Sequence, residues 1–217
     1  QKCCGWRPLM TLAAKKGRRA DPQKDEAIID AASALFTERG YGVSIDEIAA
    51  AAGVSKQTIY ARYDSKQDLF AAVVHRTAED LVGPLSVGSA PPEEALVQFG
   101  ERFVEVVFAP AKIAMQRAII AEAANFPELA ERYYENGPQF VRDRLARYLA
   151  RAAEAGKLGA LDADEAAAQF LGLIIGSDHM SALMGVAAAY NEKEQRARVR
   201  RAVGAFLKIY GAGQTAG

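Results

Sequence analysis

The chain has 217 residues, half of them apolar, and its 27 basic residues are balanced by 27 acidic ones. This composition excludes global disorder and allows a sizeable core in one large domain or two small ones. No apolar run approaches the roughly 18 residues of a membrane span, and the start of the chain lacks a signal-peptide pattern. The only cysteines, Cys3 and Cys4, are adjacent and provide neither a disulfide framework nor a zinc site. We therefore expect a cytoplasmic protein with no membrane partner.

Residues 1–22 contain glycine, proline and basic side chains without sustained apolar periodicity. Residues 1–24 hold seven basic residues against one acidic residue, Asp21, so positive charge is concentrated in this part of the chain. We expect a flexible basic arm here. An amphipathic helix is then predicted over Pro22–Arg39, ended by Gly40. Its apolar stripe consists of Ile28, Ala31, Ala32, Leu35 and Phe36.

Residues 44–66, SIDEIAAAAGVSKQTIYARYDSK, predict two short helices joined by a tight turn. Ser44 is placed to cap the first helix, with a glutamate three residues later as in a capping box. Gly53 supplies the left-handed residue that ends this helix, and Ser55 caps a second helix over Lys56–Tyr63. This arrangement is typical of a helix-turn-helix, although alanine-rich helix pairs also occur in plain bundles.

Helical periodicity turns Ile59 and Tyr63 of the second helix toward the core and leaves Gln57, Thr58, Tyr60 and Arg62 facing outward. Amide, hydroxyl and guanidinium groups of these types suit base edges and phosphates in a DNA major groove. A lysine at a helix N-terminus can also hold a phosphate. The predicted DNA-binding residues are Ser44, Ser55, Lys56, Gln57, Thr58, Tyr60, Arg62, Tyr63 and Lys66.

The runs AIIDAASALFTERGY and IDEIAAAAGVSKQTIYARYDSKQDLF carry the pattern G-V-S-x-x-T-x-Y-x-x-Y-x-S-K. They resemble the N-terminal DNA-binding domain of TetR-family transcriptional regulators over roughly residues 24–75, about a quarter of the chain. The resemblance implies a three-helix DNA-binding domain at residues 23–68. Two positions depart from the family pattern: Ala61 is often larger in the family, and Asp46 would repel phosphate where some members place a basic residue.

Ser65 is predicted to cap a fourth helix from Lys66 to Gly83-Pro84, and a Gly/Ser/Pro-rich linker follows at Leu85–Pro92. No stretch alternates as a strand, so the expected fold class is all-α. The resemblance implies that residues 69–217 form a larger helical ligand-binding and dimerisation domain. The helices expected there are about Glu93–Phe108, Ala111–Ala124, Pro127–Glu135, Pro138–Ala155, Ala163–Ala189 and Glu192–Tyr210.

Residues 166–176, AAAQFLGLIIG, are apolar nearly all round, so a helix here must be covered on more than one side. Gly172 and Gly176 would let another helix approach closely. In the resembled family the last two helices of each subunit form a four-helix contact, which implies a homodimer. Such a dimer would present two recognition helices to the half-sites of a palindromic DNA operator, about 34 Å apart. The alternative is that both helices fill a monomeric core.

The resemblance also implies a small-molecule effector whose binding moves the fourth helix. Methionine and aromatic residues of the middle helices suit an adaptable apolar pocket, although each could be ordinary core. Arg117 could pair with an anionic ligand or with Glu122. The segment QRAIIAEAANFPELAERYYENGP resembles a C-terminal domain subtype of the family without fixing a ligand. The candidate ligand-binding residues are Phe103, Val107, Met115, Arg117, Phe126, Tyr133, Phe140, Leu173, His179 and Met180.

No motif of a catalytic, metal or cofactor site is present. Asp178 and His179 are adjacent on a predicted helix and point in different directions, and no H-x-x-x-H, C-x-x-C, G-x-S-x-G or Walker pattern occurs. We therefore expect no enzyme, no metal and no cofactor.

The function expected from the sequence is a homodimeric transcriptional repressor, released from a palindromic operator in double-stranded DNA by a small, largely apolar ligand. The basic arm would add contacts to phosphates or to a minor groove, or it would be a solvated tail. The alternatives are a transcriptional activator on the same scaffold, a helical small-molecule-binding protein without DNA binding, and a helical enzyme with an apolar pocket.

Overall fold

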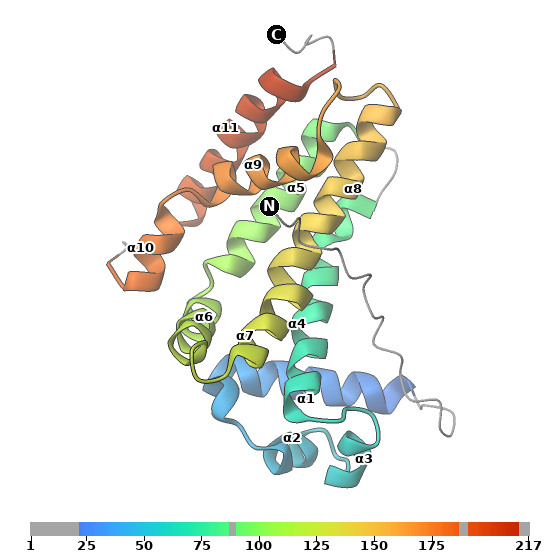
Figure 1. The fold of residues 1–217 in the computed structure, drawn as a ribbon, viewed down its shortest axis with the longest axis vertical. Helices are drawn as coiled ribbons and strands as arrows, with labels where there is room; N and C mark the ends of the chain where they lie inside the picture. The colour runs from blue at the N-terminus through green and yellow to red at the C-terminus, as the bar shows by residue number, and fades with distance from the viewer. Residues whose placement is uncertain (1–21, 87–89, 187–190, 213–217) are drawn as a thin grey trace, which may run out of the picture.

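The computed structural model describes residues 22–86, 90–186 and 191–212. Within these ranges the chain is helical, and its only bridge-type pairing joins Leu158 to Gly211. The predicted all-α class is confirmed. Figure 1 shows a small unit of short helices at the lower end of the long axis and a larger helical bundle above it. The predicted basic arm lies outside the described residues apart from Pro22.

Helices account for almost all of the described chain. Short turns of a different helical type, η1 to η3, join some of them, and η3 is a π-helical turn. The bounds are α1 Pro22–Arg39, η1 Gly40–Gly42, α2 Ile45–Ala51, α3 Lys56–Tyr60, α4 Lys66–Val82, η2 Gly83–Ser86, α5 Pro92–Val107, α6 Pro110–Glu122, α7 Pro127–Tyr134, η3 Glu135–Gln139, α8 Phe140–Glu154, α9 Ala163–Ile175, α10 Asp178–Met184 and α11 Glu192–Tyr210.

Helices α1, α2 and α3 pack against the first half of α4 around an aromatic and branched core. The rings of Phe36 and Phe70 meet edge to face with centroids 5.2 Å apart, and Ile28, Ile48 and Ile59 are fully buried beside them. Edge-to-face pairs of this kind add to the stabilisation from buried apolar area. We call this cluster, with the residues that α6 and α7 add to it, the N-terminal core.

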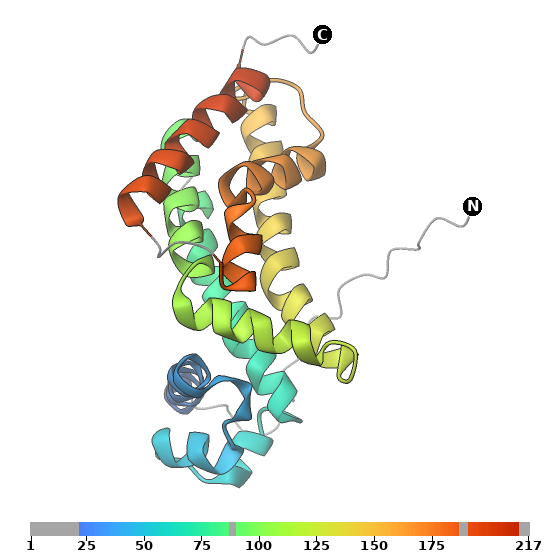
Figure 2. The same cartoon turned by 90° about the vertical axis from the view of Figure 1, so that its left-hand side faces the viewer.

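Helix α6 crosses between the small unit and the bundle, as Figure 2 shows. Two of its residues, Met115 and Ile119, are buried in the N-terminal core, and α7 adds Leu129. The small unit is therefore completed by side chains that come from the middle of the chain.

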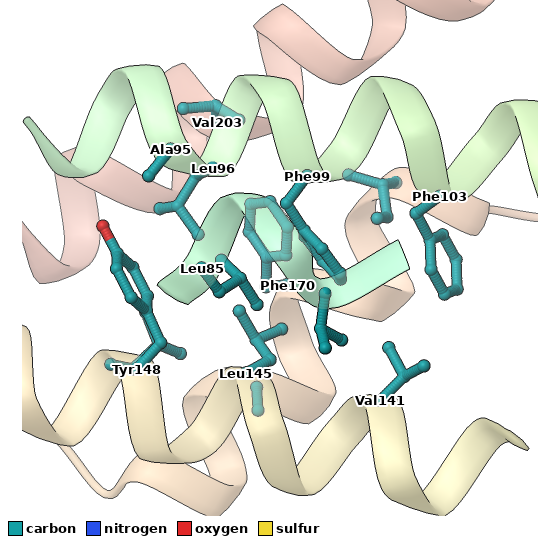
Figure 3. Close-up of a cluster of buried hydrophobic side chains, with 14 of the residues drawn as sticks. Leu85, Ala95, Leu96, Phe99, Phe103, Val141, Leu145, Tyr148, Phe170 and Val203 are labelled. Carbon is teal, nitrogen blue, oxygen red and sulfur yellow. The ribbon is translucent and has the colours of Figure 1, made fainter. Parts of the chain in front are cut away.

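The bundle is built from α5, α8, α9 and α11 around a second cluster, the C-terminal core (Figure 3). Phe99, Phe170 and Leu145 are fully buried in it. Helices α5 and α11 approach closely at Gly100, where an added Cβ would lie 2.6 Å from Val199 Cγ1. A side chain at this position would force the two helices apart.

Helix α4 belongs to both cores. Leu69 and Phe70 near its start lie in the N-terminal core, whereas Ala78 and Leu81 near its end lie in the C-terminal core. A continuous helix transmits a displacement along its length, so α4 links the two parts of the molecule mechanically (Figure 1).

The prediction of one long helix over Ala163–Ala189 is wrong. Gly176 takes a φ of +58°, which ends α9 at Ile175, and α10 begins two residues later. Helix α10 ends in turn at Gly185, whose φ is +76°. Positive φ is accessible to glycine because it lacks a Cβ. The predicted close approach at Gly172 is also absent within the described chain, where an added Cβ would meet nothing within 4 Å.

Two other boundaries differ from the prediction. Helix α3 ends at Tyr60 rather than at Tyr63. Pro138 was expected to start a helix, but it lies inside η3, which joins α7 to α8 without a loop. A π-helical turn already departs from the regular backbone pairing of an α-helix, so it tolerates a residue that has no N–H.

Candidate functional site

The turn between α2 and α3 is built as the sequence predicts. The backbone N–H of Glu47 donates to Ser44 Oγ at 3.2 Å, and the N–H of Ser44 donates to Glu47 Oε2 at 2.8 Å. This reciprocal capping box fixes the start of α2. Gly53 has a φ of +64° in the turn, and Ser55 Oγ accepts the N–H of Thr58 at 3.1 Å at the start of α3. The predicted helix-turn-helix is confirmed.

The outward face of α3 is polar and solvent-accessible. Lys56 and Gln57 are exposed, and the Tyr60 ring is 45% exposed, an unusual state for a large aromatic residue. Thr58 is half-buried, and its hydroxyl lies 2.8 Å from that of Ser55. An exposed tyrosine between amide and ammonium groups presents an apolar surface together with hydrogen-bond donors, as groove recognition requires.

Lys56 and Asp46 form an ion pair across the turn. Lys56 Nζ donates to Asp46 Oδ2 at 2.9 Å, and this bond raises the pKa of Lys56. The carboxylate that the sequence identified as repelling phosphate is therefore paired with a lysine predicted to contact DNA. Binding a phosphate at Lys56 would exchange one anionic partner for another.

Arg62 does not face outward as predicted. Its side chain is 17% exposed, with Nε 3.5 Å from Asp25 Oδ1 and Nη1 3.4 Å from the Thr58 carbonyl oxygen. Tyr63 donates its hydroxyl to the same Asp25 carboxylate at 2.9 Å. Both side chains therefore tie the end of the motif to α1, and the periodicity of a short helix could not reveal a partner 38 positions away.

Lys66 is also engaged within the protein. Its ammonium group donates to the Tyr41 carbonyl and lies 4.3 Å from the centroid of the Tyr41 ring. Burial lowers the pKa of Lys66, and the nearby Glu47 carboxylate partly offsets this. Lys66 was predicted to be available to a phosphate at the N-terminus of α4. Its side chain instead links α4 to η1. The DNA-binding roles of the nine predicted residues remain predictions.

A cavity of about 520 Å³ lies where α4, α5 and α6 meet η3, α9 and α10. This volume falls in the range of about 300–1,000 Å³ found for small-molecule sites. Among the candidate ligand-binding residues, Phe103, Val107, Tyr133 and His179 line it. The structure thus brings these four together from three helices, α5, α7 and α10.

The other candidates lie elsewhere. Met115 is buried in the N-terminal core, and Phe140 packs its ring against His75, with centroids 4.4 Å apart. Phe126, Leu173 and Met180 are exposed at the surface. Helical periodicity predicted that these residues lie on apolar faces of their helices, but it could not predict which other helix, or the solvent, each face would meet.

Arg117 also lies outside the cavity. Its guanidinium donates from Nε to the Leu183 carbonyl at 2.7 Å and from Nη2 to the Ala182 carbonyl at 2.5 Å. These carbonyls close the last turn of α10, where a cation is favourable. Arg117 therefore attaches α6 to α10. Among the described contacts it does not pair with Glu122, the protein partner that the sequence suggested.

One wall of the cavity is polar, and two of its members were missed by the sequence analysis: Lys112 and Gln116 of α6. His179 Nε2 donates to Gln116 Oε1 at 2.7 Å, and Gln116 also bonds the Tyr133 hydroxyl. Burial lowers the pKa of His179 and raises that of Tyr133, so both are neutral at pH 7. The spacing of four between Lys112 and Gln116 was the available signal, because such residues share a helix face.

The described helices include none that is both long and apolar enough to cross a membrane. In the same ranges, no three His, Cys, Asp or Glu side chains gather closely enough to hold a metal ion.

Two family models match the chain. "Bacterial regulatory proteins, tetR family" matches residues 28–73, which contain the helix-turn-helix. "AefR-like transcriptional repressor, C-terminal domain" matches residues 94–212, which contain α5 to α11. The second match alone covers more than half of the chain.

Solved structures agree over nearly the whole length. A TetR-family regulator from Mesorhizobium loti is 28% identical with a TM-score of 0.73, and the superposition covers 89% of this chain and all of that one. The Flavonoid-responsive Regulator FrrA is 35% identical with a TM-score of 0.63, covering 90% of this chain and all of that one.

A curated relative is similar over a shorter stretch. The transcriptional activator FasR of Mycolicibacterium smegmatis is 41% identical over 71 residues, which are 31% of this chain and 32% of FasR. The chain therefore matches only about a third of the length of that relative. The two family models, with the helix-turn-helix and the bundle that carry them, show that the chain belongs to the TetR family of transcriptional regulators.

Proposed function

We propose that the chain is a homodimeric repressor that binds a palindromic operator and releases it when a small, largely apolar ligand fills the cavity. One observation carries this proposal: Val74 of α4 and Ile119 of α6 belong both to the cavity wall and to the N-terminal core. A ligand that repositions these side chains acts on the helices that hold α3. A ligand can operate such a switch only if it binds more tightly to one position of these helices than to the other.

The DNA-binding side of the proposal rests on α3. Its exposed residues Lys56, Gln57 and Tyr60 provide a cation, an amide and an aromatic hydroxyl on one short helix. The capped turn before it fixes the direction of α3 relative to α2. We propose that α3 enters the major groove.

The dimer would form through the outer faces of α9 and α11. Leu173 is 41% exposed and Ile209 is 59% exposed, and a Cβ added at Gly172 or Gly204 on the same two helices would meet nothing within 4 Å. These two helices are neighbours at the surface of the bundle in Figures 1 and 2. An apolar face with small residues suits a symmetric contact with a second copy.

The names of the similar proteins support two parts of the proposal: that a small molecule is the ligand, and that the protein represses transcription. FrrA is named as flavonoid-responsive, and the model that matches the bundle describes a repressor. FasR is named as an activator, but its similarity covers only a third of the chain. A reporter gene behind the operator decides the direction, because deletion of the regulator raises expression for a repressor and lowers it for an activator.

Selection of bound sequences from a random duplex pool at about 150 mM salt tests the proposal, because salt suppresses non-specific phosphate binding. We expect a palindrome whose half-sites are separated by about one helical turn. Gln57→Ala should lose the motif, whereas Gln98→Ala, the same change on an exposed face of α5, should retain it. If folded protein recovers no motif, the proposed function fails, and the alternative of a small-molecule-binding protein without DNA binding takes its place.

A further inference from the structure

We infer that the cavity selects an acid: a ligand with an apolar body and one anionic group, carboxylate or phenolate, that pairs with Lys112. This inference rests on the proposed function, since it names the chemical class of the ligand. It follows from the distribution of charge around the cavity rather than from the cavity's size.

The described walls of the cavity are almost entirely apolar, and Lys112 is the only residue among them with a permanent charge. The lining that the structure describes contains no aspartate or glutamate. An apolar ligand body is therefore accommodated on most sides, by Phe103, Val107 and Val141 among others. The single positive charge is left without a counter-charge in the wall.

The ammonium group of Lys112 has no carboxylate partner in the described part of the cavity wall, where its residue is half-buried. This burial lowers the pKa of Lys112, because an ammonium group loses hydration inside an apolar site. A charge in such surroundings is stabilised by an oppositely charged partner. An incoming anion would supply that partner.

The neighbouring polar groups add hydrogen bonds and no charge. Gln116 bonds to both His179 and Tyr133, and His179 is neutral at pH 7 because burial lowers its pKa. The polar wall therefore presents one positive charge beside neutral donors and acceptors. A ligand with one anionic group balances it, whereas a cationic ligand would meet Lys112 with no carboxylate to offset the repulsion.

Calorimetric titration with a matched pair of probes tests the inference. Octanoate and 1-octanol share an alkyl body and differ in the anionic group. We expect wild-type protein to bind octanoate at least tenfold more tightly than 1-octanol, a difference of about 1.4 kcal/mol. Lys112→Met, which keeps the length of the side chain and removes its charge, should lose this preference and still bind the alcohol. An unchanged preference in the variant, or tighter binding of the alcohol by wild type, would overturn the inference.

A third probe, the flavonoid naringenin, separates the two kinds of acid. If Lys112→Met also weakens naringenin binding, Lys112 pairs with phenolates as well as carboxylates, whereas unchanged naringenin binding by the variant restricts the site to carboxylates. Failure of both acids to bind overturns the inference. Operator binding of both proteins is measured separately: Lys112 belongs to α6 and not to the helix-turn-helix, so the variant should bind DNA as wild type does. Acid selectivity without any operator binding would contradict the proposed function and leave the acid site standing.

Discussion

At the scale of single residues, the ion pair between Asp46 and Lys56 should weaken the proposed binding to DNA. The carboxylate competes with phosphate for the lysine, and it brings negative charge close to the proposed groove face. Asp46→Asn should therefore tighten operator binding by up to about fivefold, a small effect as expected for an exposed ion pair. Fluorescence anisotropy with a labelled operator at fixed salt measures this. Glu154→Gln, the same change of charge at the end of α8, serves as the control, and equal effects of the two changes would refute the role of Asp46.

His179 predicts how stability depends on pH. Burial depresses its pKa in the folded protein below the ordinary value of 6.5. The unfolded chain therefore takes up a proton first, and the contribution of this residue to stability is present above pH 6.5 and is lost as the pH falls. Urea unfolding between about pH 8 and about pH 5 should show a steeper loss of stability for wild type than for His179→Gln. Identical slopes would contradict the neutral, buried state of the ring.

At the scale of elements, α6 is the connection between the cavity and the small N-terminal unit. Consecutive residues divide its contacts: Met115 packs in the N-terminal core, Gln116 lines the cavity, and Arg117 bonds the last carbonyls of α10. A displacement of α10, or binding of a ligand in the cavity, would therefore act directly on α6, which supports the helix-turn-helix.

Removing the Arg117 contact should loosen α10 selectively. In Arg117→Ala the carbonyls of Ala182 and Leu183 lose their charged donor, so the last turn of α10 opens more often. Hydrogen exchange should accelerate at the amides of residues 181–186 and remain unchanged in α11. Equal protection of α10 in both proteins would show that Arg117 does not hold it.

The sequence predicts elements better than it predicts their neighbours. Local chemistry sufficed for α1, α11 and the capping box, since periodicity, serine caps and glycine stops act within a few residues. The break at Gly176 was missed because an apolar run does not show which glycine adopts positive φ. The inward position of Arg62 depends on a partner in α1, which is distant in sequence. The place of Lys112 in the cavity wall likewise depends on residues from α4, α7 and α10. Neither could be predicted from the local sequence.

At the scale of the whole molecule, the proposed dimer makes α9 and α11 the determinants of operator affinity. Leu173→Glu should place a charge at the centre of the apolar face and yield monomers in analytical ultracentrifugation. Operator affinity should fall about tenfold or more, because each subunit then binds its half-site separately. Ala124→Glu, at an exposed position near the end of α6, is the control for added charge. A dimeric Leu173→Glu protein would place the interface elsewhere.

In the proposed mechanism, a ligand in the cavity weakens the binding of the helix-turn-helix to DNA. The most direct test of this mechanism is the operator affinity of wild type and Lys112→Met, measured by anisotropy with and without a saturating concentration of the acid that calorimetry identifies. We predict that the acid weakens operator binding of wild type at least tenfold and that the same concentration leaves the variant nearly unaffected. Unchanged operator affinity of wild-type protein that demonstrably holds the acid would contradict the account.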